Sequence, residues 1–553
     1  MRKFILLFIL LILYHNLLAQ IVYEPVNSPV YEFLEQMSVK GIITYQDIIK
    51  PLARKNIANY LIEFKKQENK LSKVEKDELY FYLNDYQDEI KRLSCVKDTT
   101  ESYNFIYPDF QSANLFNYKN ELFTFNADII YGYSIQNKFG KKFTHRWNGA
   151  SVYGYLSDKL GYYFNFRDNR EESKILDPAK TLTDEMGITA IPKDDGLEYS
   201  EAMGGLSYDW NWGSISFVKD YLTWGYEKSG NVVLGRKAPT YPYIRLDINP
   251  APWFSFNYIH AFLESRMIDS LETYKIYTYQ NVDRVIYRKK FFASHTVTIK
   301  YKGLSLSAGE SMVYGDEIKA LYLLPVMFFR LADHYYSNNN NDAGDNAQFF
   351  FNISSKNHIP NTHIYTTLFI DEITLSDMFD KQKQRYQVAM NFGLSNYGLF
   401  FDNFGFTVEY TKIFPFAYQH YIKTTEYSSS NYSLGHWLGD NGDIFYLSSK
   451  YKIFRGLDIE AYYKYLRKGN GGLSDSLMRL RQYTVPQPQF LWGKVTNRTY
   501  VGAKLSYQFW HNLFFQFHYE YTNFKDELND FSRTFDYQLG KNHNFNISIY
   551  YRL

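Results

Sequence analysis

A period-two alternation of apolar and polar residues constrains the fold most, and it runs from about Glu121 to the end of the chain. The last stretch, Asn542 to Leu553, is a clear instance. Its odd positions are mostly apolar and its even positions mostly polar, with His543, Phe545, Ile547, Ile549, Tyr551 and Leu553 set against Asn542, Asn544, Asn546, Ser548 and Arg552. Such alternation indicates a β-strand with one apolar and one polar face.

The same alternation recurs in Phe123–Ile135, Leu160–Arg167, Val501–Phe509 and Leu513–Tyr521. Two folds are compatible with it. In a soluble β-sandwich the apolar faces point inward, whereas in a large transmembrane barrel they meet lipid and the polar faces line a wet lumen. The alternation alone does not choose between them.

The N-terminus and the aromatic content favour the barrel. Met1–Ala19 has Arg2 and Lys3 ahead of an apolar run from Phe4 to Leu13, which predicts a secretory signal peptide cleaved near Ala19. No later run is long enough to cross a bilayer as a helix, so a span must consist of strands. The 54 Tyr and 45 Phe residues suit aromatic girdles at both interfaces, although a soluble carbohydrate-binding protein could also be aromatic-rich.

We therefore predict a mainly β protein, an antiparallel transmembrane barrel over residues 121–553, in the outer membrane of a Gram-negative bacterium. The length allows about 16 to 20 strands. We expect the strand at Asn542–Leu553 to pair with the first strand and close the barrel. Five polar stretches are expected as loops that mostly face outside, namely Asp168–Leu197, Asp333–Asn346, Thr424–Asp443, Leu466–Thr496 and Asn523–Lys541.

The pattern in residues 20–100 predicts a small helical module on the periplasmic side, and we expect a linker over 101–120. Apolar residues recur at helical spacing in three segments. The first is expected to be capped by Ser28 and to end at Gly41, and the second follows Pro51. The third starts with a capping box of Ser72 and Glu75 and continues to Leu93.

Charge and motifs exclude several function classes. With 61 basic and 59 acidic residues, the chain has no electrostatic case for nucleic acid. The single Cys95 cannot form an internal disulfide, and we expect it in a buried helix. The sequence lacks G-x-S-x-G and H-E-x-x-H motifs, so we predict no enzyme, no cofactor and no metal site.

Two segments combine Asp, Asn, His and Arg with aromatics, as a sugar site requires. They are Leu323–Glu372 and Ser433–Asp443. The candidate ligand-binding residues are Arg330, Asp333, His334, Asp371, Glu372, His436 and Asp440. The alternative is a packed lumen in which these charges satisfy one another.

Three stretches in these segments and two near the N-terminus carry a family resemblance. The first three are P-V-M-F-F-R-L-A-D-H (325–334) with the downstream D-N (345–346), L-F-I-D-E (368–372) and L-G-H-W-L-G-D (434–440), and the other two are V-Y-E-F-L-E-Q-M-S-V-K-G (30–41) and K-P-L-A-R-K-N-I-A-N-Y-L (50–61). The chain resembles the Wzi-type capsule-assembly outer-membrane proteins. This resemblance implies a helical periplasmic module, a barrel of about 18 strands, and a lectin-like, non-enzymatic role in attaching capsular polysaccharide to the cell surface. Similar proteins of gliding bacteria serve motility or adhesion.

The partners we expect are capsular or surface polysaccharide, outer-membrane lipid and, during biogenesis, the barrel-assembly machinery, with the protein itself a monomer. The charged inner face also permits a second reading, a transport barrel for sugars or other small solutes. An outer-membrane enzyme is disfavoured because no pair of nucleophile and base is visible.

Overall fold

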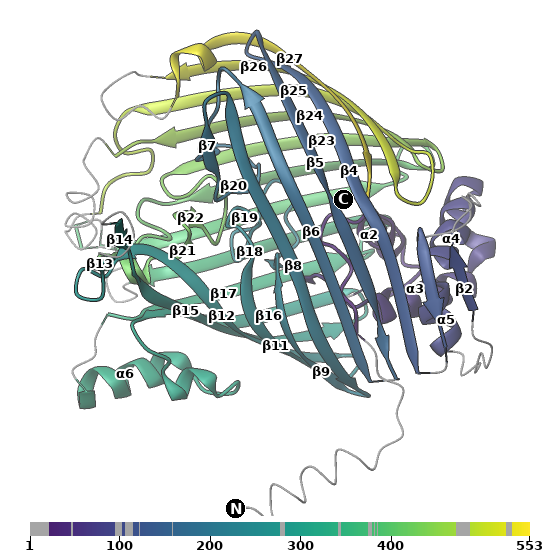
Figure 1. Ribbon diagram of the computed structural model, residues 1–553, viewed down its shortest axis with the longest axis horizontal. Helices are drawn as coiled ribbons and strands as arrows, with labels where there is room; N and C mark the ends of the chain where they lie inside the picture. Colours follow the sequence, from purple (N-terminus) through teal and green to yellow (C-terminus); the bar gives the residue numbers. More distant parts are fainter. Residues whose placement is uncertain are drawn as a thin grey trace, which may run out of the picture.

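The computed structural model describes residues 21–45, 48–93, 102–105, 114–120, 122–157, 159–276, 282–340, 344–373, 379–380, 382–383, 385–471, 487–526 and 534–552. The expected signal peptide and Cys95 lie outside these residues. Within them, eighteen antiparallel strands form a closed barrel (Figure 1). No helix in the described part of the chain is long and apolar enough to cross a membrane.

The wall strands are β4 (Phe123–Lys138), β5 (Lys141–Leu156), β6 (Leu160–Ser173), β8 (Gly196–Trp210), β9 (Gly213–Asp220), β11 (Tyr241–Ala251), β12 (Phe254–Ile268), β15 (Tyr287–Tyr301), β16 (Leu304–Gly315), β17 (Asn346–Lys356), β18 (Thr362–Ile373), β19 (Tyr386–Tyr397), β20 (Phe404–Ile413), β23 (Gly442–Phe454), β24 (Leu457–Gly469), β25 (Val495–Gln508), β26 (Leu513–Asp526) and β27 (Gly540–Tyr551).

The barrel closes where β27 pairs with β4, with Ile547 opposite Ile135. Strand β3 (Phe116–Lys119) pairs with the beginning of β4, and β2 (Ser102–Phe105) pairs with β3. The expected linker therefore contributes two short strands beside the closing pair. The prediction that the last strand seals the barrel is confirmed.

The apolar side of each strand points outward. On β4, Ile129 is 57% exposed while its neighbour Asp128 is buried, and on β27 Ile547 is 51% exposed while Ser548 is buried. A soluble sandwich would bury the apolar face, so this orientation excludes it. The predicted fold class, an antiparallel transmembrane barrel preceded by a small helical part, is confirmed.

The two ends of the barrel differ in their connections. At one end, the short-turn end, the strands are joined by two to six residues. At the other, the long-loop end, the connections have 12 to 30 residues, apart from a two-residue turn between β4 and β5. The helical module lies at the short-turn end, at the right in Figure 1.

The helices of the module are α2 (Val30–Val39), α3 (Arg54–Lys65), η1 (Glu68–Lys70), α4 (Lys73–Asp85) and α5 (Gln87–Leu93). The capping box is present, since the backbone N–H of Glu75 donates to Ser72 Oγ and the N–H of Ser72 to Glu75 Oε2. At the first helix Pro29, and not Ser28, is the capping residue, and no side chain caps it.

The third expected helix is broken in two at Tyr86. Arg54 donates a hydrogen bond to the Asp85 carbonyl at 2.8 Å, which takes the acceptor that an unbroken helix would use. The same buried guanidinium pairs with Glu24 at 2.7 Å and Glu89 at 2.8 Å. Glu89 also accepts from Tyr155 of the β5 wall, so this network joins the module to the barrel.

Three long connections fold into the lumen, and we call them together the plug: residues 174–190, 221–240 and 414–441. Their apolar side chains form one buried core with inward-facing wall residues and with the start of the module; it includes Tyr23, Ile49, Leu182, Trp224, Val233, Ile259, Phe292, Tyr365, Tyr418, Tyr427 and Leu434. Strand β10 (Thr223–Trp224) of the plug even pairs with β1 (Ile49–Lys50) of the module.

The plug corrects the expectation of a wet lumen. Polar inner-wall groups bind the plug backbone, as where Glu409 accepts hydrogen bonds from the N–H groups of Lys228 and Ser229 at 2.6 and 2.7 Å. Around this attachment the lumen is packed with apolar side chains. The remaining short elements are β7 (Ile191–Lys193), β13 (Tyr274–Ile276), β14 (Val282–Arg284), η2 (Ala320–Leu323), α6 (Phe329–Asn340), η4 (Lys423–Thr425), β21 (Ser428–Ser429), β22 (Tyr432–Ser433) and η5 (Asp536–Gln538).

Candidate functional site

A cavity of about 550 Å³ remains between the plug and one side of the barrel wall, and we call it the lumen cavity. Its walls come from β4, β5, β6 and β8 on one side and from β24, β25, β26 and β27 on the other. The plug segment 175–188, Trp437, Phe139, Tyr537 and Gln538 form the rest of its lining. The cavity therefore lies where strands from both ends of the chain meet.

Aromatic rings line much of this cavity. The ring of His145 lies 4.7 Å from Trp147 and 6.3 Å from Tyr199, measured between centroids. On the opposite side, Phe524 lies 5.1 Å from Tyr500. Such rings present flat apolar faces, on which the apolar faces of sugar rings can stack.

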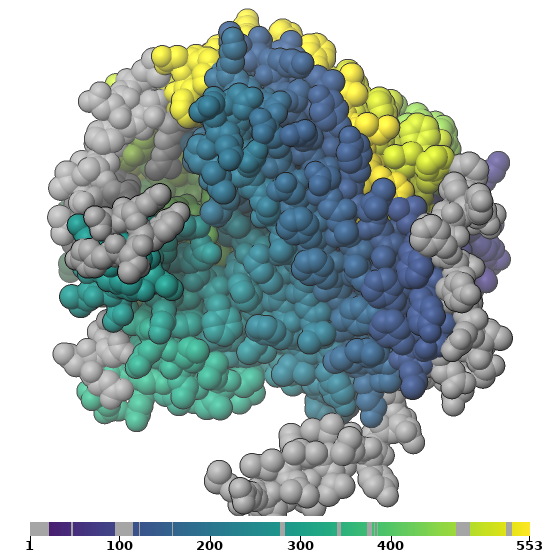
Figure 2. Space-filling model, in the orientation of Figure 1, coloured from purple at the N-terminus to yellow at the C-terminus, as the bar shows by residue number. Residues whose placement is uncertain are grey.

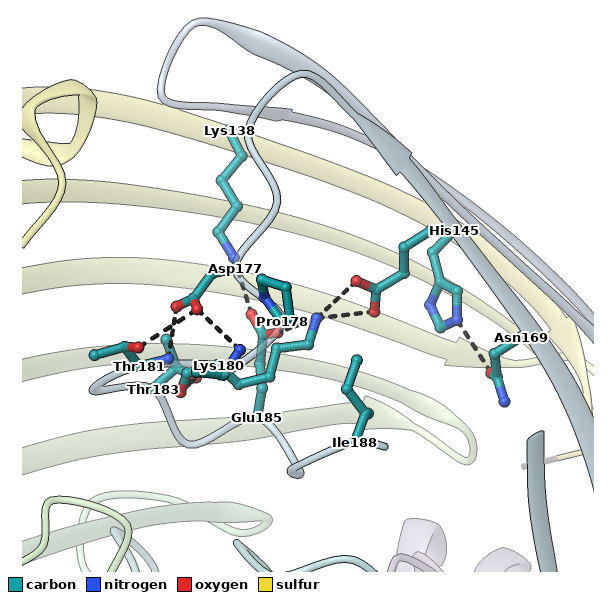
Figure 3. A network of polar contacts seen from close by, with 12 residues as sticks. Lys138, His145, Asn169, Asp177, Pro178, Lys180, Thr181, Thr183, Glu185 and Ile188 are labelled. Carbon is teal, nitrogen blue, oxygen red and sulfur yellow. Dashed lines mark hydrogen bonds and ion pairs between the residues drawn. The ribbon is translucent and has the colours of Figure 1, made fainter. Parts of the chain in front are cut away.

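Ion pairs fix the plug segment that borders the lumen cavity (Figure 3). Lys180 binds Glu171 of β6 at 2.7 Å, Glu185 accepts from Lys138 of β4 at 2.9 Å, and Asp184 pairs with Lys464 of β24 at 2.7 Å. The Lys464 ammonium holds the pKa of Asp184 below its usual value. Each charge in these pairs thus has a partner on another element.

Lys237 also holds the plug segment that borders the lumen cavity, through hydrogen bonds to its backbone. Its ammonium donates hydrogen bonds to the carbonyls of Lys180, Thr183 and Glu185 at 2.6, 2.9 and 3.0 Å. Burial lowers the pKa of Lys237 to about 8. Three donors and three carbonyl acceptors match the full capacity of an ammonium group, which holds the turn in one shape.

A second cavity of about 450 Å³ adjoins the first, and we call it the rim cavity. Connections at the long-loop end build it, from residues 179–182, 431–433, 437–439 and 534–535 together with Lys237. Lys180, Leu182 and Trp437 line both cavities. Together the cavities provide room for several sugar units.

Trp437 is held rigidly at the junction of the two cavities. Its indole N–H donates to the Ser229 carbonyl at 2.6 Å, and the His436 ring stacks against it at 5.3 Å between centroids. The ring is only partly buried. A fixed, partly exposed indole between two cavities suits stacking against a sugar ring.

Charge in the lumen cavity is nearly balanced. Five basic side chains line it, Lys138, Arg167, Lys180, Lys464 and Arg498, against six acidic ones, Glu171, Asp177, Asp184, Glu185, Glu201 and Glu520. The lining thus offers no strong field of one sign, and a ligand would be recognised by stacking and hydrogen bonds. Among the described residues, no group of three or more His, Cys, Asp or Glu side chains is placed to hold a metal ion.

The seven predicted site residues do not come together. Arg330, Asp333 and His334 lie on α6, which packs on the outer face of the wall. Arg330 pairs there with Asp333 at 2.9 Å. The loop expected at Asp333–Asn346 is instead helical through Asn340, because Phe329, Ala332 and Tyr336 provide a helical stripe that packs on the barrel.

The other four predicted residues are at the plug or its rim. Asp371 accepts a hydrogen bond from the N–H of Tyr418 at 2.8 Å, and Asp440 pairs with Lys468 at 3.1 Å. His436 is fully buried, and burial lowers its pKa to about 3. Glu372 pairs with Arg385 at 2.5 Å. None of the seven lines either cavity, and their contact with a polysaccharide stays a prediction.

Sequence reasoning missed the residues that do line the cavities. Trp437 lies between His436 and Asp440 in a segment that the sequence analysis selected, but the two polar residues were predicted as ligand-binding and Trp437 was not. Lys180, Asp184 and Glu185 fall in the stretch expected as an outer loop. The available signal was apolar Leu182 and Met186 on either side of this acidic pair, which is unusual for a solvated loop.

No protein-family model matches the chain, and no curated protein matches its sequence. Solved structures do match its fold. Wzi of Escherichia coli, described as an outer-membrane protein involved in group 1 capsule assembly and as a carbohydrate-binding β-barrel, is 13% identical, with a TM-score of 0.57 and coverage of 97% of this chain and 100% of Wzi.

Two other solved structures match less well. OprD of Pseudomonas aeruginosa is 12% identical over 77% of this chain and 94% of its own, with a TM-score of 0.41. OccAB2 of Acinetobacter baumannii is 10% identical over 78% and 99%, also at 0.41. The similarity to Wzi that was inferred from sequence segments is confirmed at the level of the fold: this chain has a Wzi-like β-barrel fold.

Proposed function

We propose that this protein is an outer-membrane barrel that binds exported capsular or surface polysaccharide and attaches it to the cell surface without catalysis. The observation that carries the proposal is the pair of adjoining cavities at the long-loop end, which share the rigid Trp437. Long loops of such barrels face outside the cell, where an exported polymer arrives. The Wzi-like fold agrees with this role.

The remaining parts of the proposal follow from the same barrel. Its apolar outer face would lie in outer-membrane lipid, the assembly machinery would insert it after signal-directed export, and it would act as a monomer. Polysaccharide attachment would also serve surface adhesion or gliding motility. Of the seven residues predicted from the sequence, exposed Arg330 and His334 would contact the polymer only at the outer surface, away from the two cavities, whereas buried His436 would support the Trp437 ring.

A direct binding measurement tests the proposal. Surface polysaccharide from the source bacterium, titrated into purified protein in detergent, is expected to bind with saturation, whereas dextran of similar length is expected to bind weakly or not at all. Isothermal titration calorimetry reads both. Equal binding of the two polymers would contradict a specific site, and absence of binding by the surface polysaccharide would contradict the proposed function.

A transport barrel for small solutes is the second candidate, and the polar inner wall favours it. Inward-facing Asn126, Ser134, Asn544 and Ser548 are typical of a channel lining. The plug opposes this reading, because its apolar core fills the middle of the lumen. Ion conductance separates the two candidates, because a sealed barrel gives no steady current and a transport barrel does.

A further inference from the structure

Residues 316–340 of the connection between β16 and β17 lie outside the barrel, and we call them the strap. It contains η2 and α6 and appears at the lower left of Figure 1. In Figure 2 its green atoms extend the outer surface of the wall at the same place. Tyr322, Phe329 and Ala332 of the strap pack on outward-facing residues of β12, β15 and β16: Tyr258, Phe291, Ala293, Met312 and Tyr314.

The outer face of the wall beneath the strap carries polar groups that bind the strap backbone. Glu310 occupies an outward position of β16, and its carboxylate accepts hydrogen bonds from the N–H groups of Phe329 and Arg330 at 2.8 and 2.6 Å. Tyr258 donates to the Tyr322 carbonyl at 2.8 Å. A carboxylate that faces lipid is costly. The strap therefore shields the Glu310 carboxylate from lipid, and these hydrogen bonds hold the start of α6 against the outer wall.

The strap is apolar on its far side as well. Val326 is 85% exposed, Leu331 63% and Tyr335 54%. At about 100° per residue, Phe328, Leu331 and Tyr335 form a stripe beside the barrel-facing stripe of Phe329, Ala332 and Tyr336. The apolar arc of α6 thus spans about 160°, and the opposite arc carries Arg330, Asp333, His334 and Ser337.

The stripe of Phe328, Leu331 and Tyr335, which we call the outer stripe, lies beside an exposed apolar part of the barrel wall. Exposed Ile299, Leu306, Phe351 and Ile353 on the outer faces of β15, β16 and β17 continue the same apolar surface toward the short-turn end. Phe328 of the strap contacts the outward Phe349 ring, at 6.0 Å between centroids. The outer stripe is therefore continuous with the band of the barrel that meets lipid.

We propose that the strap is an in-plane lipid anchor, with its outer stripe buried among the acyl chains of the leaflet at the long-loop end. Its polar arc, which includes Arg330 and His334, faces the headgroups. An amphipathic helix with one apolar and one polar arc adopts this position at a membrane interface. The strap would then hold the barrel at a fixed depth, independently of any polysaccharide.

Site-directed spin labelling of the full chain in phospholipid vesicles tests this inference. Cys95→Ser removes the native thiol, and single cysteines then carry nitroxides at Val326 or Leu331, at Ser337 on the polar arc, and at Ile299 on the bare wall. We expect labels at Val326, Leu331 and Ile299 to collide more with oxygen than with a water-soluble nickel complex. The label at Ser337 is expected to show the reverse.

Two results would overturn the inference. If Val326 and Leu331 labels respond like the Ser337 label, the strap lies in water. If they are shielded from both reagents and show spin–spin broadening, a second copy of the chain covers the stripe. Heat-modifiable migration on gels confirms that each labelled variant is folded, so neither result can arise from misfolding.

Discussion

Replacing Trp437 with alanine is expected to weaken polysaccharide binding by about 30-fold, which corresponds to about 2 kcal/mol for the loss of a central aromatic anchor. Among the described residues, the Trp437 indole is the aromatic side chain that lines both cavities, and its N–H is fixed by the Ser229 carbonyl. Trp437→Phe keeps a flat ring but loses the hydrogen bond, and an intermediate affinity is expected. Calorimetric titration of the variants measures the effect.

Trp253→Ala is the matched control. This tryptophan is 57% exposed in the two-residue turn between β11 and β12, at the opposite end of the barrel. We expect its removal to leave the affinity unchanged. If both alanine variants bind as tightly as the parent, the polymer does not occupy the two cavities.

Removal of the plug is expected to turn a closed barrel into a channel. The intact protein should give no steady current in planar bilayers, because the plug core packs between the inner wall and the helical module. Replacing residues 222–236 and 417–438 with short Gly-Ser linkers removes most of that core. A barrel of this size then leaves an aqueous channel, and we expect conductance at least about tenfold above that of the parent.

Removing the β13–β14 hairpin serves as the control, since it shortens a long connection that is not part of the plug. Its conductance should match that of the parent. A large, steady current through the intact protein would instead support the transport reading and refute a sealed lumen.

Local patterns predicted the strands well because alternation depends on neighbouring residues. The Ser72–Glu75 capping box is equally local and is present. Closure joins distant residues, since the strand at Phe123–Ile135 pairs with the final strand at Asn542–Leu553. It was predictable because a closed barrel leaves no strand edge unpaired, so its last strand must pair with its first.

The plug and the strap were not predictable in this way, because contacts between distant residues determine them. Tyr418 donates to the Val232 carbonyl across 186 positions of sequence, and no local pattern indicates this pairing. Glu310 carried a usable signal. It interrupts the outward apolar series Leu306, Ala308, Met312 and Tyr314, which indicates that the wall is covered there.

The candidate site also depends on contacts between distant residues, and its residues were not predicted from local patterns. Sequence reasoning sought charged residues near aromatics and chose His436, whose ring is buried behind Trp437. Alternation and composition do not reveal which side chain of a loop faces a cavity, since this depends on the path of the folded plug. The polar residues chosen at 330–334 lie on the strap for the same reason.

Retention of surface polysaccharide on cells tests the central claim most directly. In a strain that lacks this protein, we expect polymer synthesis to continue while most of the polymer moves from the cell pellet to the medium. Expression of the intact protein should restore the pellet fraction, and the Trp437→Ala variant should restore it only in part. An unchanged pellet fraction in the deletion strain would contradict a role in attaching polysaccharide to the cell surface.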